Sequence, residues 1–122
     1  STLSPSSAAS DVYKRQTLLR NIFYRSNILS SNSQQFAQKL MSQVEPSQRW
    51  GITAGVPSDA KMALKNGWLP DDDGWIVNSI GHIKNKQADY VIAVLTNGSD
   101  TEEDGINLIE KLSKQTYREL AK

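Results

Sequence analysis

Lys65, Asn66 and Gly67 interrupt a stretch, residues 61–69, whose composition otherwise predicts a β-strand. Strands seldom contain glycine because it packs no side chain, so a glycine there indicates that another group approaches the backbone closely. The lysine beside it supplies a positive charge that attracts an anionic group. The three residues therefore predict a strand against which an extended, negatively charged ligand pairs, as peptides do when they add to a sheet edge.

Side-chain alternation divides this strand into two faces. One face is small and cationic and consists of Lys61, Ala63, Lys65 and Gly67. The other face is expected to face the core and consists of Met62, Leu64 and Asn66. The cationic face also fits a second interpretation, an exposed edge strand whose lysines prevent pairing with other chains. Composition leaves both interpretations open.

The elements that must position this strand follow from apolar spacing. Apolar residues recur at helical intervals in two segments, which predicts short helices at 17–25 and 33–44. Ser33 is a suitable cap for the second helix, which ends before Pro46. Two glycines and a proline then predict an irregular connection over residues 49–60.

Three strands are predicted, at 61–69, 75–83 and 90–96. The turns between them, 70–74 and 84–89, suit antiparallel hairpins. The last strand is apolar on both faces, whereas a sheet with one wet face would alternate. Both faces of the sheet are therefore expected to be covered by helices, as in part of a larger sheet.

The C-terminal segment predicts an amphipathic helix of about five turns. It opens with Ser99 and Glu102 at the spacing of a capping box. Its apolar positions repeat every three or four residues: Ile106, Ile109, Leu112, Thr116 and Leu120. The predicted fold class is therefore α+β, an α/β/α sandwich with a three-stranded antiparallel sheet, two short helices before it and this helix after it.

Composition limits the function classes. The chain has 122 residues, enough for one domain, and its 14 basic and 13 acidic residues give no excess charge for nucleic acid or an anionic membrane. It contains no cysteine, which excludes disulfides, thiolate chemistry and cysteine-based zinc sites. No apolar run approaches the roughly 18 residues of a membrane span.

Residues 1–16 differ from the rest of the chain. The first ten include five serines, and the next six, DVYKRQ, match a back-translation of the end of a transposase adaptor used for sequencing libraries. We predict that residues 1–16 are a non-native, adaptor-derived segment. A disordered linker or a spent export signal is the alternative, although no apolar signal core is present. Residues 17–122 then form the second segment, the authentic domain portion.

Lys65-Asn66-Gly67, which leads a strand ahead of a hairpin and a closing helix, resembles the K-[ST]-G element of penicillin-recognising serine hydrolases. These are the class A β-lactamase-like enzymes and DD-peptidases. The wider stretch RWGITAGVPSDAKMALKNGWLP…GWIVNSIGHI…DYVIAVLTNG is similar to the C-terminal third of secreted members of that family. The likeness covers residues 17–122 and is densest over 49–98.

The resemblance implies roles for four residues. Lys65 would be catalytic, holding the substrate carboxylate and polarising the serine of an S-D-N motif. Asn66, Gly67 and Trp68 would bind substrate, with the Trp68 N–H as one oxyanion donor. Asn66 stands where the family has Ser or Thr, so an amide replaces a hydroxyl. The resemblance implies no cofactor.

The family's nucleophile motif, S-x-x-K, occurs once, at Ser58–Lys61, in the loop that enters the strand, whereas the family carries it at the start of a helix. We interpret Ser58 as a turn residue and Ser30-Ser31-Asn32 as a turn between helices. The chain is therefore expected to be a C-terminal fragment that is inactive alone, with the missing N-terminal part of its own domain as a partner.

The resemblance further implies an extracytoplasmic location and a β-lactam or peptidoglycan peptide as ligand. A small non-enzymatic α+β binding or scaffold domain is the alternative function. His82 is interpreted as a satisfied or solvent-facing strand histidine, and Asp71–Asp73 as a polar turn without calcium-loop spacing. The tryptophans are interpreted as core or rim packing instead of a carbohydrate surface: Trp50, Trp68 and Trp75.

Overall fold

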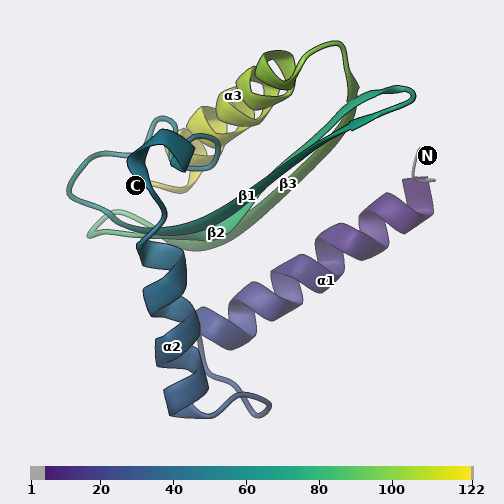
Figure 1. Ribbon diagram of the computed structural model, residues 1–122. Coiled ribbons are helices and arrows are strands. Elements are labelled where there is room, and N and C mark those ends of the chain that lie inside the picture. The colour runs from purple at the N-terminus through teal and green to yellow at the C-terminus, as the bar shows by residue number, and fades with distance from the viewer. Residues whose placement is uncertain (1–4, 122) are drawn as a thin grey trace.

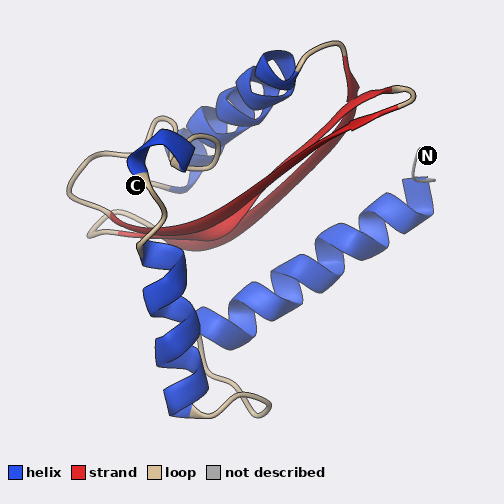
Figure 2. Ribbon diagram, viewed as in Figure 1, coloured by secondary structure: helices blue, strands red, loops and turns tan. Residues whose placement is uncertain are grey.

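A computed structural model, which describes residues 5–121, shows three α-helices around a three-stranded antiparallel sheet (Figures 1 and 2). In chain order the elements are α1 (Pro5–Phe23), α2 (Ser31–Ser42), the 3-10 helix η1 (Pro46–Gln48), β1 (Lys61–Asp71), β2 (Gly74–Lys84), β3 (Asp89–Ser99) and α3 (Glu102–Leu120). The predicted α+β fold class is confirmed, and each strand is longer than its apolar pattern indicated.

The strands follow one another in the order β1-β2-β3, so β1 and β3 form the two edges of the sheet. The β1–β2 hairpin turns through two residues, because Asp71 pairs with Gly74. Gly74 has a φ of 122°, a conformation that side chains disfavour. The polar turn predicted for this segment is therefore confirmed.

The two faces of the sheet are covered by different helices. In Figure 1, α3 lies on one face and α1 crosses the other, while α2 stands beside the beginning of β1. The core under α3 consists of Ile52, Leu64, Val77, Ile83, Tyr90, Ile92 and Ile109. On the α1 side, Leu19 and Ile22 are buried together with Ala63 and Ile80. The expectation that both faces are covered is confirmed.

The buried stripe of α3 differs from the one predicted. Gly105, Ile109 and Ser113 are its buried residues. Leu112 and Leu120, expected on the apolar face, are 39% and 52% exposed. The reason is that a small residue at each end of the stripe lets the helix approach the sheet closely, and a Cβ on Gly105 would collide with Val77.

Both predicted helix caps are wrong. Ser30 caps α2, and its side chain accepts a hydrogen bond from the backbone N–H of Ser33, the residue we expected to be the cap. Thr101 caps α3 by accepting from the Asp104 N–H at 3.0 Å. Ser99 cannot cap α3 because it still pairs with β2 as the last residue of β3.

Helix α1 begins at Pro5, whereas the apolar spacing predicted a helix only over 17–25. The additional turns are polar, and alanine, lysine, arginine and glutamine among their residues favour a helix by intrinsic propensity. The helical conformation says nothing about the origin of residues 1–16, which stays a prediction. Within residues 5–121, no helix is long and apolar enough to cross a membrane.

Candidate functional site

The outer edge of β1 exposes backbone hydrogen-bonding groups. In an antiparallel strand, the N–H and C=O of one residue point to one side and those of the next residue to the other. The Met62 carbonyl accepts from Arg49, which lies outside the sheet, at 3.5 Å. The Ala63 carbonyl faces β2, since a Cβ on Gly81 would lie well inside 3.0 Å of it. Even-numbered residues therefore turn their backbone groups to the edge.

This parity places the N–H and C=O of Asn66 and the N–H of Trp68 on the open side of β1. The β1–β2 register is regular from Lys61 to Asp71, so no bulge changes the parity. Pro70 has the same parity, and its missing N–H therefore costs the sheet no hydrogen bond. The edge of β1 has the form that a peptide-like ligand needs for strand addition.

Lys65 is exposed on this edge strand, on the face opposite Leu64. Among the described residues, no carboxylate lies within ion-pair distance of its ammonium group. Its charge is therefore free to attract an anionic ligand at the edge of β1.

Gly67 is not sealed by a helix, but the space beside it is not empty either. A Cβ at this position would lie 3.0 Å and 3.2 Å from the amide oxygen and nitrogen of Asn78, its partner on β2. The glycine therefore makes room for the Asn78 side chain on one face of the sheet, and approach to its backbone from the edge of β1 remains open.

Asn66 braces the loop that precedes β1. Its Nδ2 donates to the Gln48 carbonyl at 2.9 Å and to the Trp50 carbonyl at 2.8 Å. Both amide hydrogens are thereby used, so the side chain would have to break these bonds to donate to a ligand carboxylate. In this structure Asn66 contributes to the edge through its backbone.

Trp68 and Trp50 form an aromatic pair next to the edge. Their ring centroids are 5.9 Å apart and the rings are tilted by 58°. Trp68 is 40% exposed, so the pair lies at the rim of the fold and not inside it. The rim packing predicted for these residues is what the structure shows, and it places an aromatic wall beside the Trp68 N–H.

Two fully buried serines, which the sequence reading missed, hold the loop that carries Trp50. Ser79 accepts from the Ile52 N–H at 3.0 Å, and the Ser113 hydroxyl donates to the carbonyls of Ile52 and Ala54, each at 2.9 Å. No local pattern marks these residues, because their partners are far away along the chain. They act as supports of the site.

Two serines belong to short segments whose sequence matches a motif of the family, and the structure places one in a turn and the other at a helix cap. Ser58 is exposed in the turn before β1, as predicted. Ser30 caps α2. Ser58 therefore does not lie at the first turn of a helix, where the lysine of its motif would activate the hydroxyl, and the motif at Ser30 contains no lysine.

His82 belongs to a second polar cluster, on the α1 face of the sheet. Its Nε2 lies 2.8 Å from Asp89 Oδ1, and the Tyr24 hydroxyl donates to the same oxygen at 2.7 Å. The ring stacks on Phe23 at 4.4 Å and 22°. The interpretation of His82 as a satisfied strand histidine is confirmed, but its partners were not predicted.

The pKa values in this cluster follow from its contacts. Partial burial by itself would raise the pKa of Asp89, but the hydrogen bonds from Tyr24 and His82, with the nearby Lys84, hold it below its ordinary value. Burial, followed by the hydrogen bond to Asp89, raises the pKa of the Tyr24 phenol well above its usual range. Asp89 is therefore a stable anion at neutral pH.

Replacing Asp89 with Asn should change how stability depends on acid. Because the folded pKa of Asp89 is lowered, its contribution is present above the unfolded value of about 3.9 and disappears as the pH falls through the folded value. The native chain should therefore lose more stability than D89N below about pH 4. Thermal melts of both proteins between about pH 2 and 6 measure this, and parallel curves would contradict it.

Two comparisons of the chain with known proteins gave different results. A family model described as "Beta-lactamase enzyme family" matches residues 9–120, nearly the whole chain. No curated protein matches the chain significantly.

Proposed function

Because the chain belongs to the beta-lactamase enzyme family, we propose that the edge of β1 is the substrate-binding wall of a serine hydrolase. The proposed ligand is a β-lactam or the end of a peptidoglycan peptide, both of which carry a carboxylate beside an amide-like carbonyl. The observation that carries the proposal is the position of Lys65 on the same open edge to which the Trp68 N–H points.

Each group has a chemical task in this proposal. The Lys65 ammonium attracts the ligand carboxylate, and the exposed backbone of Asn66 pairs with the ligand as an added strand. The Trp68 N–H stabilises the oxyanion that forms when the carbonyl is attacked. Loss of one such donor typically costs about 2.7–4 kcal/mol of transition-state stabilisation. The pair of Trp50 and Trp68 packs against the ligand's acyl side chain.

We also propose the group within the family to which the chain belongs. The K-N-G residues support the class A β-lactamase and DD-peptidase group, whose members act through an acyl-enzyme on a serine. We propose that this chain is the C-terminal part of such a domain and that the attacking serine comes from another part of it. An extracytoplasmic location accompanies this proposal.

The chain by itself should not be labelled by a fluorescent penicillin. The motif-matching serines Ser58 and Ser30 occupy a turn and a helix cap, so neither of them forms a serine–lysine pair of the family type. Denaturing gel electrophoresis after incubation measures this, with an intact penicillin-binding enzyme as the labelled control. A covalently labelled band would contradict the assignment of the nucleophile to another part of the domain.

A further inference from the structure

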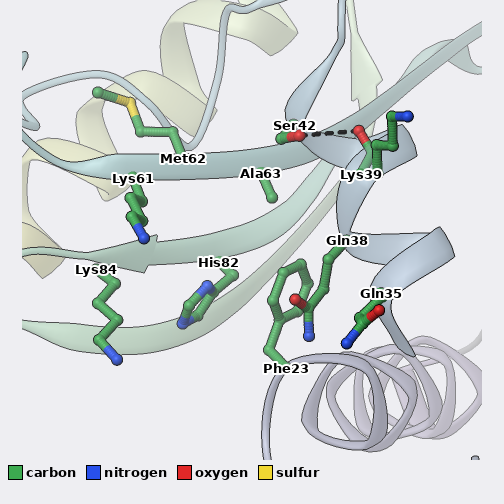
Figure 3. A pocket seen from close by; sticks show the side chains of 10 residues that line it. All are labelled: Phe23, Gln35, Gln38, Lys39, Ser42, Lys61, Met62, Ala63, His82 and Lys84. Carbon is green, nitrogen blue, oxygen red and sulfur yellow. Dashed lines mark hydrogen bonds between the residues drawn. The ribbon is translucent and has the colours of Figure 1, made fainter. Parts of the chain in front are cut away.

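A cavity of about 590 Å³ lies on the α1 face of the sheet, beside the first residues of β1 (Figure 3). Its volume is within the range of small-molecule sites. The wall consists of side chains from α1, α2, β1 and β2: Phe23, Gln35, Gln38, Lys39, Ser42, Lys61, Met62, Ala63, His82 and Lys84. The lining therefore contains three lysines and a histidine and no carboxylate.

Two of these lysines lie side by side on neighbouring strands. Lys61 and Lys84 are cross-strand partners on β1 and β2, and Figure 3 shows both side chains extending in the same direction, beside His82. Like charges opposite one another in a sheet are destabilising. An anion between the two ammonium groups would remove that repulsion.

The surrounding acids leave most of this charge uncompensated. Among the described residues, Asp89 is the carboxylate that contacts the set, at 2.8 Å from His82 and 3.9 Å from Lys84. It already accepts from Tyr24, and Lys61 and Lys39 have no acid within ion-pair distance in the described part of the chain. The cavity is thus a positively charged hollow.

Apolar groups also line the cavity. Phe23 stacks on the His82 ring, and Ala63 lies on the same face of β1 as Lys61. The Met62 side chain points to the opposite face of the strand. A phosphate group alone fills only a small part of about 590 Å³. The two neighbouring ammonium groups of Lys61 and Lys84 match the two negative charges of a phosphate monoester better than the single charge of a carboxylate.

We propose that this cavity binds a small phosphate monoester, with the phosphate at Lys61 and Lys84 and the organic group against Phe23 and Ala63. The site is separate from the edge of β1, because Lys61 and Lys65 lie four residues apart along an extended strand, or roughly 13 Å. The inference does not depend on the proposed function.

Phenyl phosphate is the probe, and His82, the single histidine of the chain, is the reporter. At constant ionic strength, phenyl phosphate should shift the ring resonances of His82 in a saturable way. Inorganic phosphate should bind more weakly because it lacks the ring, benzoate more weakly because it carries one charge, and phenol should not bind. Equal binding of benzoate and phenyl phosphate would overturn the phosphate assignment.

The variants Lys61→Gln and Lys84→Gln should each weaken phenyl phosphate binding about tenfold, the loss expected for one charge-assisted contact. The matched controls Lys111→Gln and Lys114→Gln, which change exposed lysines of α3, should bind normally. Without ligand, K61Q should be at least as stable as the native chain, since one repulsive charge is gone. Unsaturable shifts, or equal affinity in all four variants, would overturn the proposal.

Discussion

The Gly81→Ala variant is expected to lose about 2–3 kcal/mol of unfolding free energy. Gly81 is buried in β2 opposite Leu64. A Cβ there would collide with the Ala63 carbonyl, and it would lie 2.8 Å from Ile52 Cδ1 and 3.0 Å from Leu64 Cα. Two of these three neighbours are backbone atoms of β1, so the strands of the sheet must shift.

Urea unfolding of the native chain and G81A measures this loss. Gly67→Ala is the matched control, because it also adds one methyl group to a strand of the same sheet. Its Cβ would meet only the side chain of Asn78 at 3.0–3.4 Å, which is able to move. G67A should therefore stay within about 1 kcal/mol of the native chain. Equal losses in the two variants would show that the contacts of Gly81 are not the cause.

The Lys65→Gln variant should bind benzylpenicillin about tenfold to a hundredfold more weakly than the native chain. This is the range expected when a charge-assisted contact to a carboxylate is lost. The glutamine keeps most of the side-chain length but not the charge. Titration followed by the backbone amide resonance of Trp68 measures reversible binding and also reports whether the ligand reaches the edge of β1.

Two controls make this result specific. The methyl ester of benzylpenicillin lacks the carboxylate, so it should bind the native chain and K65Q equally. Lys61→Gln changes a lysine of the same strand that lies at the separate cavity, and it should leave benzylpenicillin binding unchanged. Native-like affinity of K65Q for benzylpenicillin would contradict the proposed role of Lys65. Such a result would not affect the assignment of the fold or of the family.

The sequence by itself determined the architecture, because periodicity and turn chemistry are local properties. Alternation assigned Leu64 to the core, and Asp71–Gly74 specified the first hairpin. The helical spacing of apolar residues near the C-terminus predicted the length of α3, but it did not predict which residues of this helix are buried. The K-N-G residues likewise indicated the family that residues 9–120 match.

Only the tertiary structure decided which polar side chains support the site. Ser79 and Ser113 bond to the Ile52 backbone across 27 and 61 residues, and Tyr24 reaches Asp89 across 65. A serine or asparagine in a sequence shows its capacity to donate and accept but not its partner. The partner is fixed when strands and helices pack and every buried polar group must be satisfied, so these contacts appear only with the fold.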